Sequence, residues 1–244
     1  MKKEWFEEWF DASYYHLLYN RHDEQEARRT MDNLLAVLNL DSGARILDLA
    51  CGKGRHARYL AECGYDVTGL DISWNSISEA RKYENERLAF FQHDMRKLFR
   101  TNYFDAVLNM FTSFGYFSKE ADHLHTVQNA AKALKPGGLL FIDFLNAHSV
   151  RRNLVASEVK EVEGITFHLH RSIEGGFVFK TIAFEAEGKQ YRFRESVRLF
   201  ELPDFESLFA QAGLTLLRTF GDYDMSAFEP TQSKRLMLLA QKQA

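Results

Sequence analysis

The chain has 244 residues, of which 45% are hydrophobic and 27% are charged, and this balance excludes a largely disordered, collagen-like or coiled-coil chain. Its formal net charge of −3 argues against a strongly basic nucleic-acid-binding protein. Two cysteines are too few for a disulfide framework. Glutamates interrupt the apolar stretch of the first ten residues, so we expect no signal peptide, no membrane span and a cytoplasmic location.

Two apolar stripes with helical spacing precede the first predicted strand. They consist of Trp5, Phe6, Trp9 and Phe10, followed by Met31, Leu34, Leu35 and Leu38. Between them, residues 13–19 form an aromatic segment. Residues 1–43 are therefore predicted to form an N-terminal helical cap, which ends at Gly43.

From residue 45 onward, short hydrophobic strands alternate with helices. Strands are predicted at 45–49, 66–71, 88–92, 105–110 and 139–143, and helices at 55–63, 73–83 and 119–134. The segment Pro136-Gly-Gly138 is expected to separate the last of these helices from the last strand. Such alternation indicates βαβ units with right-handed crossovers and a parallel sheet, here the core of residues 44–150.

The pattern changes to alternation with period two over residues 158–201, within a segment that starts at residue 151. Hairpin turns are predicted at Gly175-Gly176 and at Glu187-Gly-Lys189. Residues 151–201 are therefore interpreted as an inserted antiparallel sheet with one solvent-exposed face. Its apolar face must cover something, and the sheet is expected to be a lid or a dimer contact. Residues 202–244 are predicted to supply a helix and a closing β-hairpin of the core.

One segment at the first strand-to-helix turn carries the clearest chemical signal, Asp48-Leu-Ala-Cys-Gly52-Lys-Gly54. Ligands of open α/β sheets bind at the carboxyl ends of strands, where glycines let a ligand approach the backbone closely. The spacing of the glycines also fits a dinucleotide site. Asp48, at the end of the strand, would repel dinucleotide phosphates and attract an amino group.

Two further acidic residues end the next two predicted strands. Asp71 is placed to accept hydrogen bonds from both hydroxyls of a ribose. Asp94 is placed to accept a hydrogen bond from the exocyclic amino group of adenine, with Ile72 and Met95 around the ring. Together with Asp48, these strand ends describe a ligand that contains adenine, ribose and an amine.

These motifs, together with Leu134-Lys-Pro-Gly-Gly138, resemble the motif series of class I S-adenosylmethionine-dependent methyltransferases over residues 45–145, more than a third of the chain. The resemblance implies an α/β fold, with a Rossmann-like, doubly wound, seven-stranded and mostly parallel sheet. It also implies S-adenosylmethionine as the cofactor. The cofactor contacts expected beside Asp48 are Ala50, Gly52, Gly54, Asp71, Ile72, Asp94, Met95 and the backbone of Asn109.

A narrower resemblance rests on Asn109-Met-Phe-Thr-Ser-Phe-Gly-Tyr-Phe117 and on the inserted sheet. These are similar to the branch of small-molecule methyltransferases that includes sugar amine and glycine N-methyltransferases, which implies a small-molecule acceptor. Residues 109–112 differ from the Asn-Pro-Pro-Tyr motif of DNA amino-methyltransferases, and no nucleic-acid partner is expected. Substrate contacts are expected at Tyr14, Tyr15, Tyr19, Phe114 and Tyr116.

The chemistry of the acceptor is left open at this point. An amine nitrogen is expected, and a general base is not identified; the candidates are Tyr15, Tyr19, His123 and His125. His168 and His170 share one strand face, but without a third ligand they predict a wet sheet face, and no metal is expected. The alternatives are an NAD(P)-dependent oxidoreductase, against which Asp48 argues, and a non-catalytic S-adenosylmethionine-binding protein.

Overall fold

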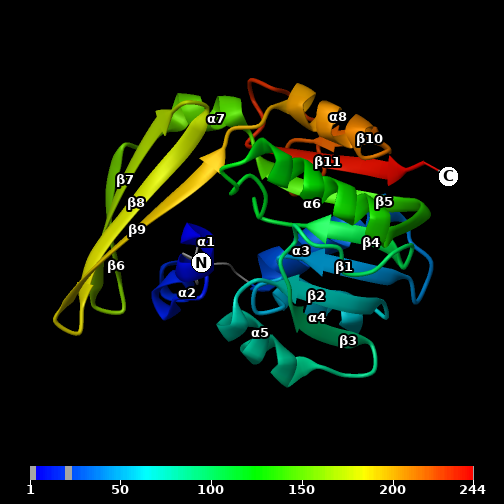
Figure 1. Cartoon of the computed structure of the whole chain (residues 1–244), viewed down its shortest axis with the longest axis horizontal. Coiled ribbons are helices and arrows are strands. Elements are labelled where there is room, and N and C mark those ends of the chain that lie inside the picture. Colours follow the sequence, from blue (N-terminus) through cyan, green and yellow to red (C-terminus); the bar gives the residue numbers. More distant parts are fainter. Residues whose placement is uncertain (1–3, 20–23, 244) are drawn as a thin grey trace.

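The computed structural model describes residues 4–19 and 24–243, which contain two β-sheets. The strands of sheet A are β1 (Arg45–Leu49), β2 (Asp66–Asp71), β3 (Leu88–Gln92), β4 (Phe104–Asn109), β5 (Leu134–Leu145), β10 (Leu214–Phe220) and β11 (Arg235–Lys242). The strands of sheet B are β6 (Ser157–Val162), β7 (Ile165–Glu174), β8 (Phe177–Ala186) and β9 (Lys189–Arg198). Figure 1 shows the two sheets at opposite ends of the molecule.

Sheet A has the strand order β10-β11-β5-β4-β1-β2-β3. Strands β1 to β5 are parallel, and β11 runs antiparallel between β5 and β10. This confirms the predicted seven-stranded, mostly parallel sheet with a closing hairpin. The strand order reverses between β1 and β4, and the carboxyl ends of strands at such a reversal border the crevice in which ligands of this architecture bind.

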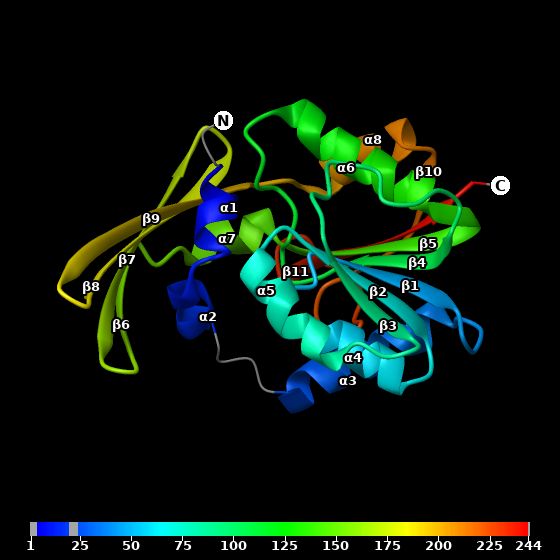
Figure 2. The same ribbon diagram turned by 60° about the horizontal axis from the view of Figure 1, so that its bottom comes forward.

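Helices cover both faces of sheet A (Figure 1, Figure 2). On one face lie α3 (Glu24–Leu38), α4 (Arg55–Glu62), α5 (Trp74–Ala80) and a single 3-10 turn (Arg81–Tyr83), and on the other lie α6 (Glu120–Ala133) and α8 (Leu202–Gln211). Each face buries its own apolar cluster, with Met31, Leu34 and Leu60 in one and Phe205 and Phe209 in the other. Sheet A is therefore packed between two layers of helices, and this packing fixes the positions of its strand ends.

The structure corrects the prediction for Pro136-Gly-Gly138. These residues lie within β5, which begins at Leu134, whereas the sequence predicted a break and a strand from residue 139. The pairing of β4 with β5 shifts register between Phe104 and Ala106, opposite this segment. Phe104 pairs with Leu134 and Ala106 with Leu139, so one residue of β4 lies opposite four of β5, and Gly137 has a φ of +75°. The segment thus forms an irregularity within β5, and regular pairing with both neighbouring strands begins at Leu139.

The helices of the N-terminal segment pack in two different places, although the sequence predicted a single cap. The apolar stripe of α3 packs against sheet A. By contrast, α1 (Trp5–Trp9) and α2 (Ser13–Tyr19) pack on sheet B through Trp9 and Leu18, which contact the cluster around Phe167 and Ile182. Figure 2 shows α1 and α2 between the two sheets.

Sheet B has the predicted hairpins and the predicted alternation. The turns at 175–176 and 187–188 join β7, β8 and β9. The apolar face carries Phe167, Leu169, Ile182 and Phe184, and α1 and α2 of the same chain cover it. Sheet B is connected to sheet A through α7 (Ala147–Asn153), which follows β5.

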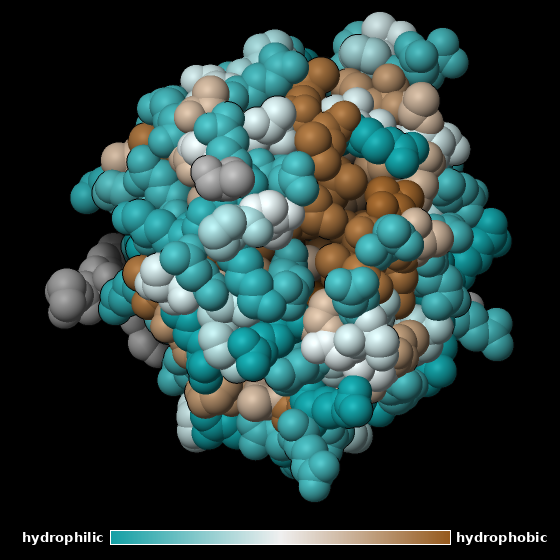
Figure 3. Space-filling view, turned by 90° about the vertical axis from the view of Figure 1, so that its right-hand side faces the viewer, coloured by the Kyte–Doolittle hydropathy of each residue, from teal (hydrophilic) through white to brown (hydrophobic). Residues whose placement is uncertain are grey.

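The side of the molecule that carries the C-terminus faces away from sheet B. Figure 3 shows on this side a strip of hydrophobic surface between larger hydrophilic areas. In the part of the chain that the structure describes, no helix has the length and hydropathy needed to cross a membrane.

Candidate functional site

Two adjoining cavities lie at the carboxyl ends of the parallel strands, under α1 and α2. The smaller, of about 100 Å³, is lined by the loops after β1, β2 and β3. The larger, of about 630 Å³, extends from the loop after β1 to β9 of sheet B. Both are lined by Phe10, Tyr15, His16, Ala50, Gly52, Ser113 and Tyr116. A ligand in the smaller cavity can thus meet a second ligand in the larger one.

The smaller cavity brings together most of the residues predicted to bind the cofactor. Those on its wall are Ala50, Gly52, Asp71, Ile72, Asp94 and Met95. The carboxylate of Asp71 accepts hydrogen bonds from the backbone N–H of Gly52 and of Ser73, each at 2.8 Å. These bonds fix its orientation and leave further lone pairs for a ligand. Burial raises the pKa of Asp71 although both bonds oppose this shift.

Asp48 lies deep in the larger cavity, with only 1% of its surface exposed. Its Oδ2 atom has no hydrogen-bond partner among the residues that the structure describes. Burial, and secondly the negative charge of Asp71, raise the pKa of Asp48 to about 7. A buried, unpaired carboxylate oxygen costs free energy unless a ligand supplies a donor, so Asp48 is suited to a cationic group.

The two glycines of the motif differ in what they make possible. Gly52 has a φ of +55°, lines both cavities and has nothing within 4 Å of the position a Cβ would take. Gly54 lines neither cavity; a Cβ there would lie 2.4 Å from the ring of Phe90. The sequence predicted that both glycines let a ligand approach the backbone. For Gly54 this is wrong, because the lack of a Cβ there makes room for the ring of Phe90.

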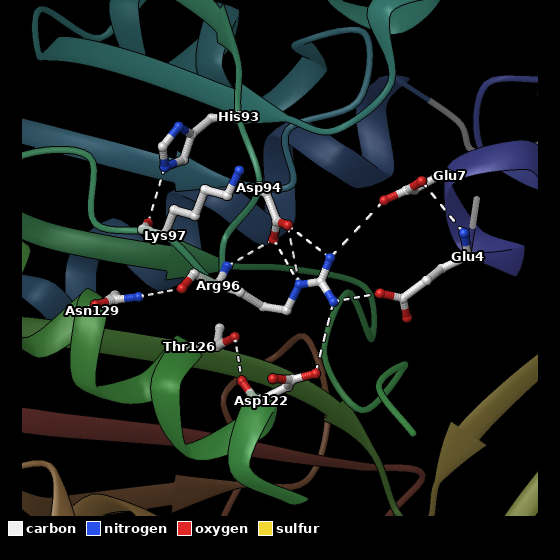
Figure 4. Close-up of polar contacts among 9 residues, drawn as sticks. All are labelled: Glu4, Glu7, His93, Asp94, Arg96, Lys97, Asp122, Thr126 and Asn129. Carbon is white, nitrogen blue, oxygen red and sulfur yellow. Dashed lines mark hydrogen bonds and ion pairs between the residues drawn. The ribbon is translucent and has the colours of Figure 1, made fainter. Parts of the chain in front are cut away.

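Asp94 forms an ion pair that the sequence analysis did not predict (Figure 4). Arg96 donates from Nε to Oδ1 at 3.0 Å and from Nη2 to Oδ2 at 2.7 Å. Arg96 also donates to Glu4, just before α1, at 2.5 Å, and lies 3.7 Å from Asp122 of α6. Burial raises the pKa of Asp94, but the bonds from Arg96 outweigh this and lower it. The roof over the cavities is thereby tied to the loop after β3.

A second connection holds the other end of α1 at the amino end of α5. Oδ1 of Asp11 accepts hydrogen bonds from the Ser73 hydroxyl at 2.8 Å and from the Asn75 N–H at 2.9 Å. The Asn75 side chain donates to the backbone oxygen of Asp11 at 2.8 Å. Together with Arg96, these contacts fix α1 at both ends above the two cavities.

The predicted substrate residues separate into two groups. Tyr15 and Tyr116 line both cavities, and Tyr19 lines the larger one. Tyr14 packs instead on Phe184 and Tyr191 of sheet B, and Phe114 is 1% exposed in the core beside α6 and α8. Neither of these two lines a cavity, because helical spacing turns Tyr14 away from Tyr15 and the loop after β4 turns Phe114 inward.

Other candidates also lie away from the cavities. Asn109 is buried and donates from Nδ2 to the backbone oxygen of Leu49 at 2.9 Å, which joins β4 to β1. His123 is enclosed by aromatic rings, where burial lowers its pKa to about 4, and His125 is exposed. Among the described residues, no group of three His, Cys, Asp or Glu side chains is arranged to hold a metal.

Three charged residues of the larger cavity were not identified from the sequence. Glu195 of β9 accepts hydrogen bonds from Trp9 at 2.7 Å and from Tyr19 at 2.5 Å. Arg235 of β11 donates from Nε to the fully buried Asp143 at 2.7 Å and from Nη2 to Thr112 at 2.9 Å. Asp143 follows a run of hydrophobic residues in a predicted strand, as Asp48 does. The sequence could therefore have indicated Asp143 as a further acidic residue near the strand ends. Lys53 is the third, next to Gly52.

Backbone conformation also marks this region as a functional site. Ala50, Phe111 and Thr112 have φ values of +64°, +55° and +59°, in the left-handed region that non-glycine residues rarely adopt. All three line the larger cavity. Such conformations cost about 1–3 kcal/mol each and concentrate at ligand-binding sites.

Comparison with known proteins agrees with this geometry. Residues 46–138 match the family model described as a methyltransferase domain. The Bacillus subtilis protein YqeM, assigned as a methyltransferase, is 31% identical over 217 residues, which cover 84% of this chain and 86% of that protein. A dTDP-amino-sugar N,N-dimethyltransferase from Streptomyces venezuelae is 27% identical and covers 69% of this chain and 74% of its own.

Solved structures show the same fold. An S-adenosylmethionine-dependent methyltransferase from Clostridium acetobutylicum superimposes with a TM-score of 0.79 at 20% identity, over 95% of this chain and 96% of that one. A sugar N-methyltransferase from a Streptoalloteichus species superimposes with a TM-score of 0.72 at 24% identity, over 94% and 93% of the two chains. Both likenesses extend over nearly the whole chain, sheet B included.

Proposed function

The chain belongs to the S-adenosylmethionine-dependent methyltransferases, and from this premise we propose that it transfers the methyl group to the nitrogen of a small amine. When bound, S-adenosylmethionine supplies a methyl group made electrophilic by the sulfonium. The observation that carries the proposal is the larger cavity, which adjoins the cofactor cavity and combines aromatic walls with the carboxylate of Glu195. The amino-sugar N,N-dimethyltransferase among the relatives supports the same acceptor chemistry.

The residues present fit the cofactor. Asp71 is placed to accept hydrogen bonds from the ribose hydroxyls, and Ile72, Asp94 and Met95 surround the space for adenine. The unpaired Oδ2 of Asp48 is placed to accept a hydrogen bond from the amino group of the methionine part. With Asp71 in the smaller cavity and Asp48 in the larger one, these residues would hold a cofactor that extends between the two cavities, where it would supply a methyl group to a neighbouring acceptor.

The part of the larger cavity beside Glu195 suits a cation, whereas Lys53, Arg55 and Arg235 line other parts of it. Trp5, Phe10, Tyr15, Tyr19 and Tyr116 present rings to it, and ring faces attract ammonium groups by about 0.5–2 kcal/mol each. Glu195 adds a carboxylate to the wall formed by sheet B. The chain's own contribution to the reaction is to hold the amine at attack distance and to keep water out under α1 and α2.

A panel of acceptors that differ only in nitrogen or oxygen tests this proposal. The pairs are benzylamine with benzyl alcohol, glucosamine with glucose, and glycine with glycolate, each incubated with S-adenosylmethionine and analysed by mass spectrometry. Methylation of one or more amines, with the matched alcohols unmodified, is expected. Methylation of the alcohols alone would overturn the proposal, and so would tight cofactor binding without transfer to any acceptor.

A further inference from the structure

A row of charged side chains crosses the covered face of sheet B. It consists of Glu158 on β6, Arg171 on β7, Lys180 on β8 and Glu195 on β9. The strand register places Lys180 opposite both Arg171 and Glu195. Arg171 donates to Glu158 at 2.7 Å, and the Lys180 ammonium lies 3.7 Å from Oε2 of Glu195. The neighbouring rows on this face are apolar, so the charged row crosses a surface that is otherwise hydrophobic.

The row runs from the surface to the acceptor cavity. The exposed fraction of the side chain falls from 33% at Glu158 to 15% at Lys180 and 16% at Glu195. Glu195 forms part of the wall of the larger cavity on one side. On the other side it lines a separate, more open cavity of about 370 Å³, together with the other three members of the row. Glu195 is therefore accessible from both cavities.

Three groups hold the Glu195 carboxylate in this position. Trp9 and Tyr19, from the helices that roof the site, donate hydrogen bonds to Oε1. Lys180 donates to the Tyr19 hydroxyl and faces Oε2. The ion pair and the hydrogen bonds offset the cost of burying a charge on this sheet face.

The chemistry of amine methylation requires a proton acceptor at this place. An alkylamine is protonated at neutral pH, and its nitrogen has no lone pair for attack until one proton leaves. Resting on the amine acceptor proposed above, we propose that Glu195 removes this proton and releases it to solvent through the more open cavity that it also lines. The proton moves from the ammonium to the Glu195 carboxylate; the neutral nitrogen then bonds to the methyl carbon while the carbon–sulfur bond breaks and its electron pair goes to sulfur.

The other titratable groups at the cavity are less suited to this task. Burial and the charge of Glu195 raise the pKa of Tyr15, Tyr19 and Tyr116, so these phenols stay protonated. Burial, and secondly Lys53, lower the pKa of His16 to about 4, which leaves it a weak base. Burial also lowers the pKa of Lys180. Asp48 is assigned to the amino group of the cofactor in the proposed function, and Arg235 carries a permanent positive charge. Tyr19, predicted as a catalytic candidate, is a positioning residue here.

The test uses Glu195→Gln, which keeps the size of the side chain and an oxygen acceptor but cannot take up a proton. With the best amine of the panel, kcat/KM at pH 7 is expected to fall at least 30-fold. The loss should shrink at least fivefold by pH 9, where more of the amine is already neutral. The dissociation constant of S-adenosylmethionine, measured by calorimetry, should change less than twofold. Glu185→Gln, an exposed carboxylate on the same sheet, is the matched control and should behave as the wild type.

A second variant tests the row independently of the size of this loss. Lys180→Met removes the cation that lies 3.7 Å from Oε2 of Glu195 and helps to hold the carboxylate in place, so kcat/KM at pH 7 should fall in this variant too, while the dissociation constant of S-adenosylmethionine changes less than twofold. An equal loss at pH 7 and pH 9 in Glu195→Gln, or full activity in that variant, would overturn this inference while the amine acceptor stands. If only alcohols are methylated, the proposed function fails and this inference fails with it.

Discussion

At the residue scale, the acidic strand ends have different tasks although they look alike in the sequence. Asp71 is oriented by two backbone N–H groups, Asp94 is paired with Arg96, and Asp48 keeps an unpaired buried oxygen. Their environments shift their pKa values in opposite directions, upward for Asp48 and Asp71 and downward for Asp94. The effects of substitutions should therefore differ in kind and not only in size.

Asp71→Ala should weaken cofactor binding by roughly 2–4 kcal/mol, about 30- to 1000-fold, because two charge-assisted hydrogen bonds to the ribose are lost. Calorimetric titration with S-adenosylmethionine measures this directly. Asp66→Ala is the control, since Asp66 lies at the opposite end of the same strand, beside Arg45. A loss below about threefold in a variant with an unchanged circular dichroism spectrum would exclude the ribose assignment.

Asp48→Asn should separate stability from binding. With a folded-state pKa of about 7 against about 4 in the unfolded chain, Asp48 binds more protons when folded, so its contribution to stability falls as pH rises from 4 to 7. The unliganded variant should therefore melt at a higher temperature than the wild type at pH 8. In the wild type the cofactor affinity should fall as pH drops from 8 to 6, since protonation removes the charge that meets the ligand ammonium. The variant should bind weakly at both pH values, and a variant with the wild-type pH dependence would contradict this assignment.

At the scale of elements, α1 and α2 form a roof fixed at both ends. Arg96 holds Glu4 at one end, and Asp11 caps the start of α5 at the other. The aromatic side chains of the same helices pack on sheet B and on the loop after β4. Since the cavities lie beneath this roof, we expect its movement to affect ligand exchange, as in enzymes with mobile lids.

Asp11→Ala should loosen the roof without unfolding it. The loss of two hydrogen bonds to a carboxylate, at about 0.5–1 kcal/mol each in this exposed setting, predicts dissociation of S-adenosylmethionine that is about 5- to 30-fold faster. Stopped-flow fluorescence of Trp5, which lines the larger cavity, can follow this rate. Glu8→Ala, an exposed change on the same helix, is the control. An unchanged dissociation rate would mean that the roof opens elsewhere.

At the scale of the whole molecule, sheet B is the support on which the roof rests. Its apolar face is covered by α1 and α2 of the same chain, so the face that was expected to form a lid or a dimer contact is used within the chain. The acceptor cavity is consequently built from three parts: the strand ends of sheet A, the roof, and β9.

Replacing residues 158–198 by a short linker should therefore remove more than a peripheral hairpin. Trp9 and Leu18 would lose the apolar surface that buries them, and Glu195 would be lost from the cavity. We expect poor solubility, strong binding of a hydrophobic dye, and no methylation of the amine acceptor. A soluble variant with wild-type turnover would show that sheet B supports neither the roof nor the acceptor.

The sequence by itself determined the features whose signal is local. The acid at each strand end, the glycine turn after β1 and the alternation of strands with helices follow from short-range backbone and side-chain preferences. They led to the fold, to the cofactor and to six of the residues that line the smaller cavity. Helical spacing likewise predicted α3. The division of the N-terminal helices between two sheets was not predicted, because an apolar stripe shows that a face is buried but not what buries it.

Only the tertiary structure decided which distant residues meet at the larger cavity. Glu195 lies 147 positions after Asp48 along the chain, and its place on the wall depends on the pairing register of β8 with β9 and on the packing of α1. Arg235 reaches the cavity because β11 inserts beside β5. Alternation along a strand defines two faces, but the sequence does not state which face meets which neighbour. That choice depends on the sum of many contacts across the folded chain.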